Sequence, residues 1–237
     1  TAASIRVQNC KDAGDVPIMF FNREMTGYGV RNSYENAYQV TSTGGDYGAS
    51  IQAQMVIDYW KEHPEMDKNG DGKLQLVYLM GDPGHTASQP RCDYLKSTIE
   101  DAGIEIDLLA EDTGMWVTAT AKEKMDAWVS KYGDEIECCV AGNDAMALGA
   151  LQAIESAGRT VGKDIYLVGV DALSEALEDV LAGTMTGTVF NDHFSQSHSA
   201  ADAAINYLNG TGNEHYIGCD YVKVTKDNAQ EILDMVK

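Results

Sequence analysis

Stretches of helical periodicity alternate with short apolar runs between residues 45 and 190. In the first stretch Ile51, Met55, Val56 and Tyr59 recur at the spacing that places apolar side chains on one face of a helix. The same spacing returns four more times along the chain. The helices predicted in this way cover residues 51–59, 94–99, 118–130, 144–157 and 174–181.

The apolar runs between these helices predict β-strands. Runs such as "LQLVYLM" and "IECCVAG" are almost continuously apolar, which is typical of strands buried on both faces of a parallel sheet. The strands predicted in this way cover residues 74–80, 104–110, 136–142, 165–170 and 185–190. Strands that alternate with helices form βαβ units. The pattern therefore predicts an α/β fold with a mostly parallel sheet.

Polar side chains and one aromatic ring follow these strands. Ligands of open parallel sheets bind beyond the carboxyl ends of the strands, so the residues there are candidates for a site. They are His85, Arg91, Trp116, Asn143, Asp144, Asp171, Asn191 and Asp192. Carboxylates accept hydroxyl protons, amides donate and accept, and an indole covers apolar C–H faces. The set predicts a pocket for a neutral polyhydroxylated molecule, although each Asn or Asp taken alone is also a common helix cap.

The charge of the chain narrows the range of partners. The 237 residues carry a formal net charge of −20, and such a field repels nucleic-acid phosphates and anionic membrane surfaces. No apolar run approaches the length of a membrane span, and no secretory leader is visible at Thr1. We expect no nucleic-acid partner, and the charge favours a neutral ligand, a cation or another protein.

Neither the cysteines nor short motifs predict catalysis. The five cysteines are odd in number and have no C-x-x-C spacing, which argues against a disulfide framework and a zinc site. The sequence contains no dinucleotide fingerprint, no phosphate-binding loop and no G-x-S-x-G elbow. We therefore expect a protein that is not an enzyme.

The segment "DKNGDGKLQ" has the ligand spacing of an EF-hand calcium loop, with Gly72 at the sharp turn. The oxygen ligands that this spacing predicts are Asp67, Asn69, Asp71, the carbonyl of Lys73 and the side chain of Gln75. Position 12, where the pattern needs a bidentate Glu, is Tyr78, and Leu74 already opens an apolar strand. The loop therefore runs into a strand instead of a helix.

A carboxylate from a neighbouring parallel strand has to complete such a ligand set. Glu137, which opens "ECCVAG", is the best-placed candidate, and Glu135 and Asp134 are alternatives. The loop precedes its strand, whereas the predicted pocket lies at the opposite strand ends. A bound Ca²⁺ would thus be structural, and a metal-free turn is the competing interpretation.

Several separate motifs resemble one protein family. They are "VPIMFFNRE", the calcium loop, "GDPGH", "DTGMW", "AKEKMDAW", "AGNDAMALGA", "VGVDAL" and "GTVFND". Over nearly the whole chain they resemble the bacterial D-galactose/D-glucose-binding proteins of ABC sugar uptake. The resemblance implies the type I periplasmic-binding-protein fold, in which two doubly wound parallel-sheet lobes joined by a three-segment hinge close over one sugar.

The resemblance also implies roles for individual residues. Trp116 would stack on the ring of the sugar, galactose or glucose. The residues implied as hydrogen-bond partners of the sugar are Asn22, His85, Arg91, Asn143, Asp171 and Asn191. The implied calcium ligands are Asp67, Asn69, Asp71, Lys73 through its carbonyl, Gln75 and Glu137. The implied partners are the membrane subunits of an ABC transporter and a chemoreceptor, and the implied location is periplasmic or extracellular. A lipid anchor in the parent protein is left open.

One departure from the family concerns the sugar contacts. Ala87 stands where the family has an Asp that holds one end of the sugar together with the Arg. Losing a charge-assisted acceptor weakens binding by about 1.5–3 kcal/mol if nothing replaces it. Ser88 and Gln89 are the two candidate replacements, and the sugar preference, the anomer and the affinity are left open.

A second departure concerns the first lobe, because Thr1 aligns inside it. We expect an incomplete lobe of residues 1–40 and 192–222, either distorted or completed by a second chain or a further segment. Residues 41–190 and 223–237 would form a complete calcium-bearing lobe. Two other functions stay open: a truncated remnant with weak or no sugar binding, and a sugar-sensing regulatory module, against which the charge and the calcium loop argue.

Overall fold

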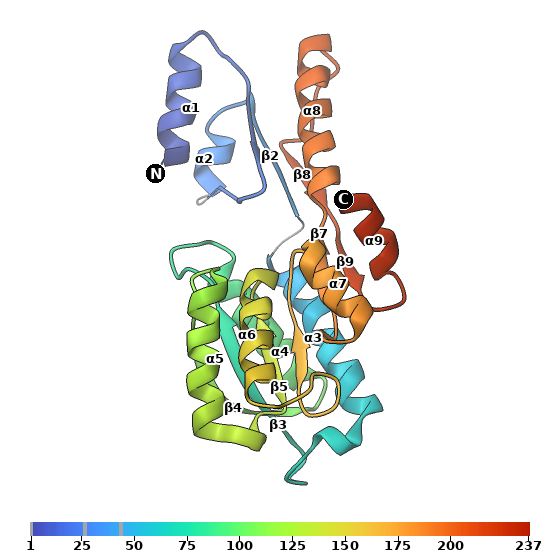
Figure 1. Ribbon diagram of the computed structural model, residues 1–237. Coiled ribbons are helices and arrows are strands. Elements are labelled where there is room, and N and C mark those ends of the chain that lie inside the picture. The colour runs from blue at the N-terminus through green and yellow to red at the C-terminus, as the bar shows by residue number, and fades with distance from the viewer. Residues whose placement is uncertain (1, 26–27, 43–44) are drawn as a thin grey trace. The chain divides into compact units, whose positions relative to one another are not determined.

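The computed structural model describes residues 2–25, 28–42 and 45–237, and the chain divides into two compact units (Figure 1). Unit 1 consists of Thr1–Gly44 and Asp192–Asp220, and unit 2 consists of Gly45–Asn191 and Tyr221–Lys237. The chain therefore passes between the units three times. The corresponding divisions predicted from the sequence lie at residues 40, 190 and 222.

Unit 2 is built on a parallel sheet with the strand order β4-β3-β5-β6. Its strands are β3 (Lys73–Met80), β4 (Glu105–Thr113), β5 (Cys138–Ala141) and β6 (Tyr166–Val168). Adjacent strand residues point to opposite faces, and the neighbours Cys138 and Cys139 are both fully buried. The sheet is thus covered on both faces, and the α/β fold expected from the apolar strands is confirmed.

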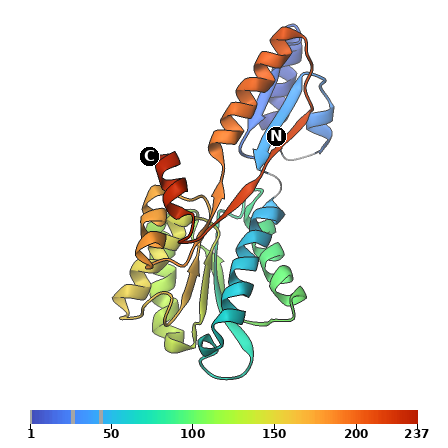
Figure 2. The same cartoon turned by 90° about the vertical axis from the view of Figure 1, so that its right-hand side faces the viewer.

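Helices cover both faces of this sheet (Figure 2). The helices of unit 2 are α3 (Gly45–Glu62), α4 (Ser88–Asp101), α5 (Thr118–Tyr132), α6 (Asp144–Ser156), α7 (Ser174–Ala182) and α9 (Ala229–Val236), with short 3-10 turns at Pro64–Met66 and Gly133–Glu135. Leu74, Leu76 and Tyr78 alternate along β3 and share one buried cluster with apolar residues of α3 and α4. Helices α5 and α6 pack side by side on the other face.

The strands predicted at 136–142, 165–170 and 185–190 are each shorter in the structure, and the last of them has an unexpected partner. Strand β7 (Thr188–Asn191) begins three residues after the predicted start at residue 185, and it pairs antiparallel with β9 (Tyr221–Val224). Gly187 forms only an isolated bridge with Val168. A Cβ on Gly187 would lie 2.3 Å from the Met55 methyl carbon and 2.7 Å from the carbonyl oxygen of Val224, so crowding fixes this position as glycine.

Close packing of α5 against α6 depends on Gly149. A Cβ on this residue would lie 2.2 Å from the carbonyl oxygen of Thr118. Because that atom belongs to the backbone, it cannot swing aside as a side chain can. The two helices would have to separate to accept any larger residue.

The change Gly149→Ala is expected to lower the free energy of unfolding by about 1–3 kcal/mol, the usual cost of overpacking. The sign is informative, because Gly→Ala inside an exposed helix otherwise stabilises by about 1 kcal/mol. Urea unfolding followed by tryptophan fluorescence reports on unit 2, which contains all three tryptophans, Trp60, Trp116 and Trp128. Gln152→Ala on the exposed face of α6 is the matched control, and equal stability of the two variants would contradict the close approach.

Unit 1 contains a smaller parallel sheet with the order β1-β2-β8. Its elements are α1 (Ala2–Asp12), β1 (Ile18–Phe21), α2 (Tyr28–Asn32), β2 (Ala37–Ser42), α8 (His193–Asn209) and β8 (Tyr216–Cys219). Within the described residues, β1 pairs along one edge only. Ile5, Phe21 and Leu208 are 64%, 61% and 81% exposed, so this unit presents apolar side chains to solvent. None of the described helices is long and apolar enough to cross a membrane.

Candidate functional site

Six of the seven residues predicted to contact a ligand lie in unit 2, each at or just beyond the carboxyl end of a strand. His85 and Arg91 follow β3, Trp116 follows β4, Asn143 follows β5, Asp171 follows β6, and Asn191 ends β7. The seventh, Asn22, follows β1 in unit 1. Its backbone has a positive φ of 64°, and its carbonyl oxygen accepts a hydrogen bond from the Thr41 hydroxyl.

Arg91 is the centre of the cluster in unit 2. Its side chain is buried, with Nη1 donating to the carbonyl oxygen of Gly142 at 2.6 Å and Nη2 donating to the Tyr221 hydroxyl at 3.3 Å. The guanidinium carbon lies 5.7 Å from the centre of the Trp116 ring. Burial lowers the pKa of Arg91, but Tyr221 and Asp171 raise this pKa by more, so the group stays charged. A fixed cation therefore lies among the strand ends.

Trp116 is held in place by a strained turn and by a glycine. Met115 and Trp116 have φ values of 55° and 63°, which non-glycine residues adopt only where the surroundings enforce it. The indole lies directly on Gly81, where a Cβ would come within 2.0 Å of its Cζ2 atom. The ring of His85 meets the indole edge-on, with the ring centres 5.5 Å apart. His85, Arg91 and Trp116 are thus brought together.

The two polar residues that open α6 have separate roles. Asn143 is the N-cap, and its side-chain oxygen accepts from the amide of Met146 at 3.0 Å, so its amide nitrogen is the part available to a ligand. Asp144 is fully buried and accepts from the Thr188 hydroxyl at 2.6 Å and the amide of Leu173 at 2.9 Å. Burial raises the pKa of Asp144. Asp144 thereby fixes the turn at Asp171, where φ is 118°.

Three buried polar atoms around this cluster have no hydrogen-bond partner within the described part of the chain. They are the Oγ atom of Ser88, the Nε atom of Arg91 and the Nε1 atom of Trp116. Buried polar atoms are paired in the great majority of native structures. Their concentration at the strand ends makes this region a candidate binding site for a polar ligand.

The calcium-like loop folds into a tight turn around the Asp67 carboxylate. One carboxylate oxygen of Asp67 accepts from the amide of Gly70 at 2.8 Å, and the other accepts from the amide of Gly72 at 2.9 Å. Gly70 and Gly72 have φ values of 72° and 76°, a conformation that glycine adopts without strain. Asp71 accepts from the amide of Lys73 at 2.8 Å. The backbone therefore curls around the side-chain oxygens before β3 begins.

Glu137 is the acidic residue that the fold brings to this loop. Its carboxylate accepts from the amide of Lys68 at 2.6 Å and from the amide of Gln75 at 3.1 Å, because β5 lies next to β3. Burial raises the pKa of Glu137. Glu135 and Asp134, the alternatives considered from the sequence, are both exposed.

The donor set of the loop fits a hard cation. The side-chain oxygen of Gln75 is buried without a hydrogen-bond partner among the described residues, while its amide nitrogen donates to Asp71 at 2.9 Å. Carboxylate, amide and carbonyl oxygens are the ligands that Ca²⁺ prefers. No group of three or more His, Cys, Asp or Glu side chains in the described ranges is gathered as a ready-made metal site, because the loop carboxylates turn to backbone amides.

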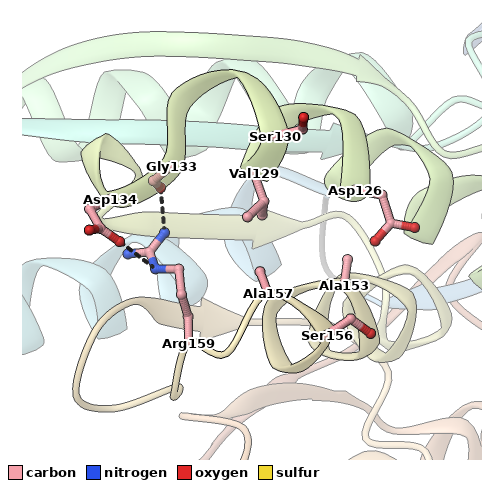
Figure 3. Close-up of a pocket in the computed structure, with 9 residues that line it drawn as sticks. All are labelled: Asp126, Val129, Ser130, Gly133, Asp134, Ala153, Ser156, Ala157 and Arg159. Carbon is pink, nitrogen blue, oxygen red and sulfur yellow. Dashed lines mark hydrogen bonds and ion pairs between the residues drawn. The ribbon is translucent and has the colours of Figure 1, made fainter.

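A cavity of about 420 Å³ lies elsewhere in unit 2, between the C-terminal ends of α5 and α6 (Figure 3). It is lined by Asp126, Val129, Ser130, Gly133, Asp134, Ala153, Ser156, Ala157 and Arg159. The buried Arg159 guanidinium donates to the carbonyl oxygens of Gly133 at 2.9 Å, Ile136 at 2.7 Å and Asp164 at 2.6 Å. These bonds hold the connection between α5 and β5 against the connection between α6 and β6, so Arg159 has a structural role.

Known proteins resemble this chain over most of its length. The sequence pattern of the family described as "periplasmic binding protein domain" matches residues 1–212. The D-galactose/methyl-galactoside binding periplasmic protein MglB of Haemophilus influenzae is 37% identical over 229 residues, which are 92% of this chain and 67% of that protein.

Solved structures share the fold. A solute binding protein of an ABC transporter from Bacillus halodurans, with bound myo-inositol, is 26% identical and has a TM-score of 0.79, covering 99% of this chain and 74% of its own. A periplasmic ribose ABC transporter protein from Conexibacter woesei has a TM-score of 0.81 at 20% identity, covering 98% of this chain and 72% of its own. The chain is thus shorter than each of these relatives.

Proposed function

Because the chain belongs to the periplasmic binding protein family, we propose that it is the binding component of an ABC sugar transporter and that its ligand is a neutral hexose, galactose or glucose. The family consists of extracytoplasmic solute-binding proteins, which are transport components and not enzymes. The type I fold expected from the sequence motifs is confirmed by the similarity to solved structures.

The observation that carries this proposal is the cluster at the strand ends of unit 2. Arg91 and His85 each lie against the indole of Trp116. A sugar presents apolar C–H faces, which an indole covers, and hydroxyl groups, which charged and amide groups bind. The proposed ligand residues are Asn22, His85, Arg91, Trp116, Asn143, Asp171 and Asn191, with Asn22 of unit 1 included on the sequence resemblance.

The choice of hexose rests on similarity to a protein named for D-galactose and methyl-galactoside binding. Other relatives are named for xylitol and D-apiose, so the family binds several polyhydroxylated ligands through one fold. The neutral character of these ligands agrees with a chain whose net charge is −20. Calorimetric titration with galactose, glucose, ribose and myo-inositol therefore tests the proposal. The absence of any heat of binding with every hexose would contradict it.

The change Trp116→Ala is expected to weaken hexose binding about 10- to 100-fold, because an aromatic surface that covers one sugar face is lost. Calorimetric titration measures this dissociation constant. Tyr94→Ala, which removes an exposed aromatic side chain from α4, is the matched control and should bind as the unmodified chain does. An unchanged dissociation constant for Trp116→Ala would contradict a contact between the indole and the sugar.

We also propose a structural Ca²⁺ held by Asp67, Asn69, Asp71, the Lys73 carbonyl, Gln75 and Glu137. The buried carboxylate of Glu137 and the side-chain oxygen of Gln75, which has no hydrogen-bond partner in the described ranges, support this proposal. The loop precedes β3, whereas His85 and Arg91 follow the same strand. The ion would therefore stabilise unit 2 without touching the sugar.

A further inference from the structure

The core-facing side of α4 begins with a polar residue. The buried residues of this helix are Ser88, Arg91, Cys92, Leu95 and Ile99. The last three pack with β-strand residues in the apolar cluster of unit 2. Ser88 lies at the start of the same face, is 1% exposed, and its hydroxyl has no hydrogen-bond partner within the described residues.

The polar groups next to the Ser88 hydroxyl do have hydrogen-bond partners. The amide of Ala87 donates to Nδ1 of His85 at 3.2 Å, and the amide of Ser88 donates to the carbonyl oxygen of His85 at 3.1 Å. Gln89 is exposed, and its side chain donates to Asp93 at 2.8 Å. Of the two candidate replacements considered from the sequence, only Ser88 has a buried group with unused hydrogen-bonding capacity.

Arg91 supplies a second unused group on the same face of the helix. Residues three apart on a helix are neighbours, so Ser88 and Arg91 are adjacent. The two Nη atoms of Arg91 are bonded to Gly142 and Tyr221, whereas Nε has no partner among the described residues. Nε can only donate, while the serine hydroxyl can donate and accept. A ligand hydroxyl satisfies both groups at once, because it accepts from Nε and donates to Oγ.

We propose that Ser88 is a specificity-determining residue that binds one hydroxyl group of the sugar beside Arg91. The inference rests on the proposed sugar-binding function of this site, and it does not depend on which hexose binds. A ligand that lacks this hydroxyl, or carries fluorine in its place, has no proton to donate to Ser88. Such analogues therefore test the contact directly.

The experiment compares the unmodified chain with Ser88→Ala and with Gln89→Ala as matched control. Ser88→Ala is expected to weaken binding of the preferred hexose about three- to tenfold, the range of one neutral hydrogen bond. Among the monodeoxy and monofluoro analogues of that hexose, those altered at one particular position should bind to the unmodified chain and to Ser88→Ala with equal affinity. Gln89→Ala should leave the whole series unchanged.

Thermal unfolding without sugar provides the second readout. A buried hydroxyl without a partner is unfavourable, so Ser88→Ala should melt at the same temperature or higher. A lower melting temperature, or failure to fold, would show that the hydroxyl has a structural partner and would overturn the inference.

The binding results separate this inference from the proposed function. If the unmodified chain binds no sugar, the proposed function fails and the inference fails with it. If the unmodified chain binds a hexose and Ser88→Ala binds it within a factor of two, the inference alone is overturned. The inference alone is also overturned if every analogue binds the unmodified chain and Ser88→Ala with different affinities.

Discussion

Removing Ca²⁺ is expected to lower the free energy of unfolding of unit 2 by about 4 kcal/mol, for an ion that binds with micromolar affinity and is present at about 1 mM. The corresponding fall in melting temperature is roughly 10 °C for a domain of this size. The physical reason lies in Glu137, whose buried carboxylate, together with Asp67 and Asp71, concentrates negative charge at the amino end of β3. Tryptophan fluorescence, with Ca²⁺ and with a chelator, measures the difference.

Glu137→Gln tests the same site without a chelator. It keeps the size of the side chain and removes the charge, so the gain in melting temperature on adding Ca²⁺ should be mostly lost. Glu135→Gln, an exposed neighbour two residues earlier, should keep that gain. The measured quantity is the difference between the two conditions for each variant, which cancels any effect on the metal-free protein. Equal melting with Ca²⁺ and chelator in the unmodified chain would contradict a structural ion.

Arg159→Ala is expected to lower the free energy of unfolding by about 3–5 kcal/mol, the usual cost of removing one partner from a buried charged network. Its guanidinium donates to the carbonyl oxygen of Gly133 (Figure 3) and to those of Ile136 and Asp164. Without it, three carbonyl groups at the edge of the cavity between α5 and α6 lose their donor. Urea unfolding followed by tryptophan fluorescence measures the loss.

Two further variants identify which contact of Arg159 matters. Asp134 lies 3.8 Å from Nε but is fully exposed, and an exposed ion pair contributes little. Asp134→Ala should therefore leave stability within about 0.5 kcal/mol. Arg159→Lys should lose much of the stability, because one ammonium group cannot reach three carbonyl oxygens as a planar guanidinium does. A large effect of Asp134→Ala would assign the stabilisation to the ion pair instead.

The sheet of unit 2 was predictable because burial on both faces leaves a strong local signal. A strand such as β3, covered by helices on either side, has to be apolar at nearly every position. The position of Glu137 was predictable for a related reason, since it opens the strand that lies beside β3. Strand β9 carried no such signal, because only Tyr221 and Val224 of its four residues are buried.

Contacts between distant segments account for the features of the site that the sequence did not reveal. Tyr221 accepts a hydrogen bond from Arg91, which is 130 residues away in the sequence, and no local sequence pattern predicts that contact. Asn143 and Asp144 were equally suitable caps by residue type, and only the fold shows that one caps α6 while the other is buried under the Asp171 turn. Ser88 and Gln89 were equal candidates by residue type, and only the burial of Ser88 separates them.

The threefold passage of the chain between its units has a consequence for synthesis on the ribosome. Strand β7 of unit 2 can pair with β9 only after residues 221–224 have been made. Until then Arg91 also lacks the hydroxyl of Tyr221. Unit 2 is therefore finished last: its strand β9 is made only after the second half of unit 1, and a nascent chain stalled before residue 221 would present an unfinished sheet to chaperones.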